Sequence, residues 1–392
     1  MTKWEWKKLK DICEIEFGTR VVRKKDGGSI YPVYGGGGAT FKMDSFNRED
    51  CLIVSRFAMS PQCTRIVKGK FFLNDSGLSL KSKDLSVLSE QYLNSIILGI
   101  NDDIYALGRG AAQRNLNVEA FKELNIPIPP LSEQKRIVKF LDEEFSKIDT
   151  LKTNAETNLK NAKELFETTL EKELNPQSRH SGRSEESSAE LPSGWDWKKI
   201  GDFCETSSGG TPLKQHNEYY ENGNIPWLRS GEVCQKEIFE TEMYITQKGM
   251  ENSSAKFFPE NSVVVAMYGA TAGQVGIVRF RTTTNQAVCG IFPNEKYKTE
   301  YLYYALLSKK NELVAQAVGG AQPNISQIKI RNLQIPLPPL SVQKEIVARL
   351  DKLSENVKRL EANYKQIIAN CDELKKSILK KTFEGDSRSS RE

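Results

Sequence analysis

The stretch LNIPIPPLSEQKRIV at residues 124–138 recurs as LQIPLPPLSVQKEIV at residues 333–347. The two copies lie 333 − 124 = 209 residues apart, and this offset holds without gaps from Tyr92 (against Tyr301) to Leu165 (against Leu374). A repeat of this length indicates that a whole structural unit has been duplicated. We therefore expect the chain to fold as two similar halves.

A long helix is predicted after each copy of this motif. The proline pairs at 129–130 and 338–339 force a backbone boundary, and Ser132 and Ser341 are suitable helix N-caps. Each helical pattern continues for about 43 residues, or roughly 65 Å. Its apolar residues alternate in steps of four and three, which is the spacing of a coiled-coil seam. The seam residues are Ile137, Leu141, Ile148 and Leu151 in the first helix and Ile346, Leu350, Leu353, Val357 and Leu360 in the second.

Each of these helices needs a partner along its seam, and its own duplicate is the simplest one. Because the chain order is domain, helix, domain, helix, a two-fold-like arrangement makes the helices antiparallel and sends the domains to opposite ends. Asn158 stands at a seam position of the first helix. It either fixes the register of the pair or is an imperfection that faces solvent.

The two halves also begin alike but differ in the middle. WEWKKL at residues 4–9 matches WDWKKI at 195–200, an offset of 191, so the second half carries 209 − 191 = 18 extra residues before its proline motif. We expect Trp6 and Trp197 to pack in the two cores. Agreement at the edges with divergence between them fits a duplicated scaffold that presents two different binding surfaces, and equally a structural duplication that has drifted.

Composition narrows the class of protein. The 392 residues carry a net charge of +5, which is compatible with nucleic-acid binding. No apolar run approaches the roughly 18 residues that span a bilayer, and the first residues lack the apolar stretch of a secretion signal, so a cytoplasmic protein is expected. The seven cysteines form no Cys-x-x-Cys pair, which favours free thiols over disulfides or zinc.

Motifs of a catalytic centre are missing from the sequence. It has only two histidines, no phosphate-binding loop of the Walker type and no Asn/Asp-Pro-Pro-aromatic motif of adenine methyltransferases. We therefore expect a chain without a catalytic residue, metal site or cofactor of its own.

The duplicated motif and its long helices resemble the conserved region of type I restriction–modification specificity subunits. Further segments are similar to that family's target-recognition domains. They are YPVYGGGG (31–38) and LIVSR (52–56) in the first half, and SGGTP (208–212), IPWLRSG (225–231), GATAG (269–273), TNQA (284–287) and GAQPNIS (320–326) in the second. The first half has AQRNL at 112–116 where the second has AQPNI, and it has no counterpart of GAT. The two domains are therefore expected to read different DNA sequences.

The resemblance implies two α/β (α+β) target-recognition domains joined by two long antiparallel coiled-coil helices in a pseudo-two-fold repeat. Each domain would lie in the major groove of one half of a bipartite double-stranded DNA target, with the helices as a ruler. Methyltransferase subunits, expected to be two, and restriction/translocase subunits would dock on this scaffold and bring S-adenosylmethionine, ATP and Mg²⁺. The alternative is a non-catalytic coiled-coil scaffold that binds protein rather than DNA. No membrane partner is expected.

These patterns divide the chain into six parts. They are recognition domain 1 (1–130), spacer helix 1 (131–174), a flexible linker (175–194), recognition domain 2 (195–339), spacer helix 2 (340–384) and a disordered tail (385–392).

Candidate DNA-contacting residues follow from side-chain chemistry. Glycines permit close backbone approach to DNA, or simply form a flexible turn. Arginines bind guanine or phosphate, and asparagine and glutamine pair with adenine, unless they remain solvated or cap a turn. Arg279, like Lys214 and Arg229, suits phosphate better than bases. The candidates are Tyr34, Gly36, Gly37, Arg56, Arg65, Arg109, Gln113 and Arg114 in the first half, and Thr211, Lys214, Arg229, Ser230, Thr271, Asn285, Gln286, Gln322 and Asn324 in the second.

Overall fold

The computed structural model describes residues 4–175, 192–316 and 324–384. It separates into two compact units, one formed by Met1–Thr157 with Tyr364–Glu392 and the other by Asn158–Asn363. Each long helix therefore contributes to both units. Most of the expected linker, the whole expected tail and Gln322 lie outside the described residues.

The matching edges of each half pair with each other as a two-stranded antiparallel ribbon. Strand β1 (Glu5–Lys8) pairs with β10 (Asn125–Ile128), and β11 (Asp196–Lys199) pairs with β21 (Gln334–Leu337). The register is the same in both, since Trp6 faces Pro127 and Trp197 faces Pro336. The expectation of a core position is wrong for Trp6, which is 44% exposed. A ribbon of two strands leaves one of its faces to solvent.

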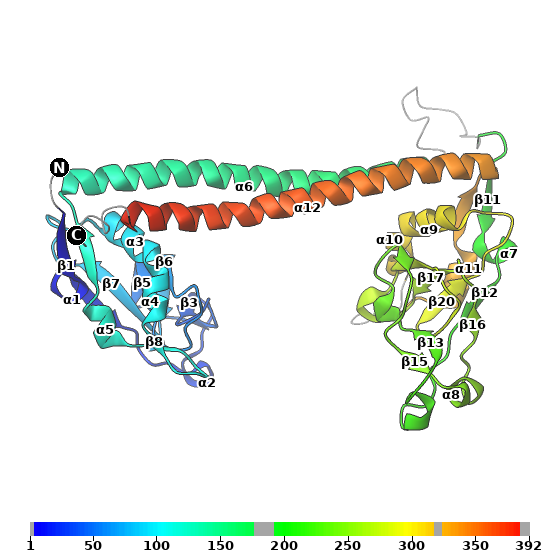
Figure 1. The fold of residues 1–392 in the computed structure, drawn as a ribbon, viewed down its shortest axis with the longest axis horizontal. Helices are drawn as coiled ribbons and strands as arrows, with labels where there is room; N and C mark the ends of the chain where they lie inside the picture. Colours follow the sequence, from blue (N-terminus) through cyan, green and yellow to red (C-terminus); the bar gives the residue numbers. More distant parts are fainter. Residues whose placement is uncertain (1–3, 176–191, 317–323, 385–392) are drawn as a thin grey trace. The chain divides into compact units, whose positions relative to one another are not determined.

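Unit 1 contains a six-stranded sheet with the order β2-β7-β5-β6-β3-β4. Strands β3, β5, β6 and β7 of this sheet are labelled in Figure 1. Its strands are antiparallel except for β3 and β6, which run parallel with Tyr34 opposite Leu73. Tyr92 and Ile96 of α3 are fully buried in the core. The elements are α1 (Leu9–Ile12), β2 (Cys13–Phe17), α2 (Arg23–Asp26), β3 (Tyr31–Tyr34), β4 (Lys42–Met43), β5 (Arg48–Ser55), β6 (Thr64–Leu73), β7 (Gly77–Ser82), α3 (Glu90–Gly99), α4 (Asn101–Ala106), β8 (Gly108–Arg109), β9 (Asn115–Leu116) and α5 (Val118–Lys122).

Unit 2 has a five-stranded sheet, β12-β20-β17-β18-β14, and a four-stranded sheet, β15-β13-β19-β16. Strands β13 and β19 run parallel, with Leu228 opposite Thr284. The elements are α7 (Ile200–Phe203), β12 (Thr206–Ser208), η2 (Asn217–Tyr219), β13 (Ile225–Leu228), η3 (Ser230–Glu232), β14 (Glu237–Ile238), β15 (Tyr244–Ile245), α8 (Gln247–Glu251), β16 (Phe257–Phe258), β17 (Val263–Ala266), η4 (Gly269–Thr271), β18 (Val275–Val278), β19 (Thr282–Thr284), β20 (Val288–Ile291), α9 (Thr299–Ser308), α10 (Lys310–Ala315) and α11 (Gln327–Asn332). Helix α9 is the repeat equivalent of α3, because it carries Tyr301 where α3 carries Tyr92.

The two long helices are α6 (Leu131–Leu174, 44 residues) and α12 (Leu340–Glu384, 45 residues) (Figure 1). In unit 1 they run antiparallel, because Asp149 pairs with Lys375 at 2.5 Å while the later residue Lys152 pairs with the earlier Asp372 at 2.7 Å. In unit 2, Glu173 near the end of α6 pairs with Arg349 near the start of α12. The expected antiparallel pairing is confirmed. No helix within the described ranges is long and apolar enough to cross a membrane.

The expected seam consists of two columns of residues on each helix, and the structure buries one of them more completely than the other. Leu141, Ile148, Ala155 and Ala162, spaced by seven, are all buried. In contrast, Leu151 and Leu360 are 51% and 38% exposed, Leu353 is half-buried and Asn158 is exposed. The expectation that both columns of the heptad would be covered is therefore wrong at Leu151 and Leu360. The second column is turned by about 60° from the first, since three residues advance a helix by about 300°.

The C-terminal end of each long helix packs into the core of the other half of the repeat. Ile137 and Leu141 of α6 lie in the unit 1 core, where Phe383 of α12 also packs, with its ring 5.7 Å from that of Tyr92. Leu170 and Leu174 of α6 lie in the unit 2 core with Ile346 and Leu350. Leu174 and Phe383 are related by the same offset as the two proline motifs, so one repeat position plugs each core.

Candidate nucleic-acid interface

The glycine run Gly35–Gly38 follows β3 and is held by side chains from the neighbouring strands. The Arg65 guanidinium donates to the carbonyls of Gly37 (2.6 Å) and Gly36 (3.4 Å), and the Ser55 hydroxyl donates to Gly36 O at 2.5 Å. A Cβ on Gly36 would lie 2.3 Å from the Phe57 carbonyl oxygen, whereas one on Gly37 would meet nothing within 4 Å. Gly36 is thus required by packing, whereas Gly37 is exposed and has open space where a side chain would stand.

Other first-half candidates gather at the β8–β9 hairpin. Arg109 pairs with Asn115 across it, and the backbone N–H of Leu116 donates to Arg56 O at 2.8 Å. Two arginines make cation–π contacts. The Cζ atom of Arg56 lies 4.8 Å from the ring centroid of Phe17 and 4.6 Å from that of Phe57, and the Cζ atom of Arg114 lies 4.5 Å from the ring centroid of Tyr105. Arg109 and Gln113 are exposed, without a side-chain partner among the residues described. Tyr34 packs edge-on against Phe71, 5.5 Å away.

In unit 2 several candidates meet where two parallel strands end. Arg229 and Ser230 follow β13, while Asn285 and Gln286 follow β19, and the carboxyl ends of parallel strands share one edge of a sheet. The backbone N–H of Asn285 donates to Leu228 O at 3.0 Å, and the Thr211 hydroxyl donates to Gln286 Oε1. The structure therefore brings these five residues together at one edge, where ligands of α/β folds commonly bind.

The remaining second-half candidates lie elsewhere. Thr271 is half-buried in η4, whose preceding residue Tyr268 forms a β-bridge with the exposed Asn324. Lys214 is exposed and has no partner within the described part of the chain.

Two of the second-half arginines are tied to carboxylates. Arg229 pairs with Glu242 (2.6 Å) and Glu232 (3.4 Å). Arg279 pairs with Glu237 and Glu300, both at 2.7 Å. Burial opposes the charge of Arg279, but hydrogen bonds to Glu300 and Glu237 outweigh it and raise the pKa of this arginine. Arg279 is therefore a structural ion-pair centre, and Arg229 must exchange partners to bind phosphate.

The turn after β19 has a counterpart in unit 1 that the sequence reading missed. Asn74 follows β6 as Asn285 follows β19, and β6 is parallel to β3 as β19 is to β13. Asn74 N–H donates to Tyr34 O at 2.8 Å, and its Oδ1 accepts from the N–H of Ser76 at 2.9 Å. Asn285 Oδ1 accepts likewise from Ala287 N–H at 3.2 Å. Each asparagine thus caps its own turn, which is the alternative considered for Asn285.

A cluster of exposed basic side chains was also not among the residues predicted from the sequence. Arg20, Arg23, Lys24 and Lys25 lie between β2 and β3, in and beside α2, and all four are exposed. None of their side chains has an ion pair or hydrogen bond inside the described ranges. We call these four residues the α2 basic cluster. Its signal was visible in the sequence as RVVRKK at 20–25.

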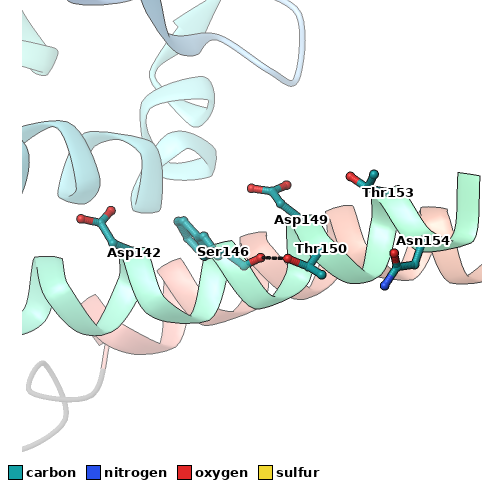
Figure 2. Close-up of a pocket in the computed structure, with 7 residues that line it drawn as sticks. Asp142, Ser146, Asp149, Thr150, Thr153 and Asn154 are labelled. Atoms are coloured by element: carbon teal, nitrogen blue, oxygen red, sulfur yellow. Dashed lines mark hydrogen bonds between the residues drawn. The ribbon is translucent and has the colours of Figure 1, made fainter. Parts of the chain in front are cut away.

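A surface pocket on α6 is lined by acidic and hydroxyl-bearing side chains (Figure 2). Asp142 and Asp149 line it with Ser146, Thr150 and Thr153, and the Thr150 hydroxyl donates to Ser146 O at 2.9 Å. Asp149 is also paired with Lys375, so the pocket is lined by one ion-paired carboxylate, by Asp142 and by hydroxyl groups. Over the described ranges, no group of three or more His, Cys, Asp or Glu side chains could hold a metal ion.

Comparison with known proteins gives a consistent result. A family model described as type I restriction modification DNA specificity domain matches residues 1–161 and 192–369. The EcoR124I/EcoR124II specificity subunit of Escherichia coli is 30% identical over 40% of this chain and 40% of its own. The MjaIX specificity subunit of Methanocaldococcus jannaschii is 24% identical over 98% of this chain and 94% of its own.

Solved structures share the fold. A chain of a type I R-M system complex superposes with a TM-score of 0.72 at 19% identity, covering 98% of this chain and 99% of its own. The HsdS subunit from Thermoanaerobacter tengcongensis gives a TM-score of 0.57 at 19% identity, covering 98% of each chain. The family model matches most of the chain in two segments, one in each half of the repeat, and the chain belongs to the type I restriction–modification DNA specificity family.

Proposed function

We propose that this chain recognises a bipartite DNA sequence and directs methyltransferase and restriction subunits to it. The proposal rests on a loop edge that occurs in both units, at the carboxyl ends of two parallel strands. In unit 1 the strands β3 and β6 lead into Gly35–Gly38 and Asn74. In unit 2 the strands β13 and β19 lead into Arg229–Ser230 and Asn285. The strand framework is shared while the loop residues differ. Such a pair of sites suits the reading of two different half-sites.

The chain itself is non-catalytic, as are the specificity subunits to which it is similar, and catalysis lies in partner subunits. S-adenosylmethionine, ATP and Mg²⁺ would accordingly be bound by those partners in the cytoplasm. Exposed leucines support a docking role for the long helices: Leu151 and Leu374 in unit 1, and Leu165 and Leu360 in unit 2, are 38–54% exposed. These positions are related by the repeat, since 151 + 209 = 360 and 165 + 209 = 374, which favours two equivalent methyltransferase subunits. The scaffold alternative would use the same leucines, but it leaves the duplicated loop edge without a role.

Domain replacement tests the proposal. Residues 1–130 are exchanged for the equivalent domain of a relative, and the methylated sites are mapped across the genome of cells that carry the system. One half-site should change while the other and the spacer persist. Exchange of residues 195–339 is the matched experiment and should alter the other half-site. A simultaneous change of both half-sites after either exchange would contradict independent recognition.

A further inference from the structure

A fully buried glutamine stands near the start of each long helix. Gln134 of α6 has no solvent exposure. Its Oε1 accepts from the backbone N–H of Ser89 at 2.9 Å, and its Nε2 donates to Val87 O (2.8 Å) and Pro129 O (2.9 Å). The amide therefore makes three hydrogen bonds, to the segment that enters α3 and to the proline pair that enters α6.

Gln343 of α12 repeats this arrangement in unit 2 and is also fully buried. Its Oε1 accepts from Lys298 N–H at 2.8 Å, and its Nε2 donates to Pro338 O (2.8 Å) and Lys296 O (3.3 Å). Each of these partners is the repeat equivalent of its counterpart in unit 1. The partner side chains differ between the units, but the backbone atoms bound are the same, so the feature retained is the glutamine-to-backbone clamp.

A buried tyrosine adds a second side-chain hydrogen bond near each clamp. The Tyr92 hydroxyl of α3 donates to Pro127 O at 2.9 Å, and the Tyr301 hydroxyl of α9 donates to Pro336 O at 2.7 Å. Both tyrosines are fully buried. The chain passing from domain to long helix is thus held by the tyrosine at the strand and by the glutamine at the proline pair, whose rings already restrict rotation.

We propose that Gln134 and Gln343 are positioning residues that determine which spacer length is accepted, because they fix the angle of each recognition domain on its helix. The inference rests on the proposed function. One added base pair moves a half-site by about 3.4 Å and turns it by about 34°. A domain on a loosened joint can follow that change, whereas a clamped domain requires the DNA to twist instead.

The test uses Q134M and Q343M chains assembled with their modification subunits. Methionine keeps the length of the side chain and removes its amide. Methylation rates are measured on duplexes with the native spacer and with one base pair added or removed. The preference for the native spacer should fall by about tenfold or more in each variant, because methionine removes all three hydrogen bonds of the amide. Discrimination against single-base changes within the half-sites should stay as in the wild type.

Q366M is the matched control, because Gln366 is exposed on α12 and bonds to Asn370. It should leave the spacer preference unchanged. Unaltered preference in Q134M and Q343M complexes would overturn the proposal. If these variants do not assemble, Y92F and Y301F decide the matter, because each removes one hydroxyl bond to the same joint and should relax the preference by a smaller factor. A wild-type complex that methylates duplexes lacking either half-site as fast as the native target would instead refute the proposed function.

Discussion

The α2 basic cluster places four positive charges, unpaired among the described residues, just before β3, the strand that leads into the glycine run of unit 1. Such side chains suit phosphate, which attracts cations without regard to sequence. In R23A/K24A/K25A we expect weaker binding to all DNA and a slope of log K against log salt that is shallower by about 0.9 for each phosphate no longer bound. Titrations of the assembled complex at several salt concentrations measure this slope.

The control for that experiment is K122A/K139A/K160A, which removes the same charge. These lysines pair with Glu119, Glu143 and Glu164 respectively. A like change of slope in both triple variants would mean that total charge, rather than the α2 basic cluster, governs binding.

At the level of single residues, sequence reading found one asparagine turn and missed its twin. Asn285 stands in the motif TNQA, whereas Asn74 stands in LNDS and is offset by 211 rather than 209, so only strand pairing reveals the match. The arginines show the same limit. Arg56 meets Phe17, which belongs to a different and much earlier strand, and no local pattern announces that contact.

Among elements, the long helices show which part of a heptad pattern stabilises the fold. Ile148 is 5% exposed and precedes by one turn Lys152, which pairs with Asp372 of α12. Ile148→Ala should therefore cost about 2–4 kcal/mol through weaker packing and a cavity. Leu151→Ala, at a half-exposed position, should change stability by about 0.5 kcal/mol or less. Urea midpoints of the two variants, followed by circular dichroism, test this difference, and equal losses would show that both columns are buried in solution.

The spacing of apolar residues predicted both helices, and the chain order predicted their antiparallel pairing, but the spacing also assigned two buried columns. Periodicity reports which residues share a face of a helix. It does not report how wide a strip the neighbouring helix covers, and that width depends on how the two helices cross. The second column is consequently exposed at Leu151 and Leu360.

For the whole molecule, the duplicated motif was enough to predict two halves joined by paired helices. It could not show that Phe383 and Leu174 plug the two cores, because those contacts join segments far apart in the chain. These plugs have a consequence for spacing experiments. Any insertion into one helix alone must either break the helix pair or withdraw its plug from a core.

Matched insertions should avoid that damage and lengthen the spacer that is recognised. Seven residues inserted after Ala155 and seven after Ile367 keep the apolar column in phase and extend each helix by about 10 Å. That length equals about three base pairs, which also turn the duplex by about 100°. Because this rotation strains the complex, affinity should fall, and the methylation that remains should use the same half-sites across a longer spacer.

Single insertions are the control for this design. An insertion after Ala155 alone lengthens α6 between its ion pairs with α12 in unit 1 and Leu174 in the unit 2 core. The Lys152–Asp372 and Asp149–Lys375 pairs and the packing of Leu174 then cannot all be kept, so folding or partner assembly should weaken. Mapping of methylated sites in cells that carry the double insertion gives the decisive measurement. Full activity at the original spacer would mean that the helices do not set the distance between half-sites. Fixing each domain on its helix through Gln134 and Gln343 would then not determine the spacer.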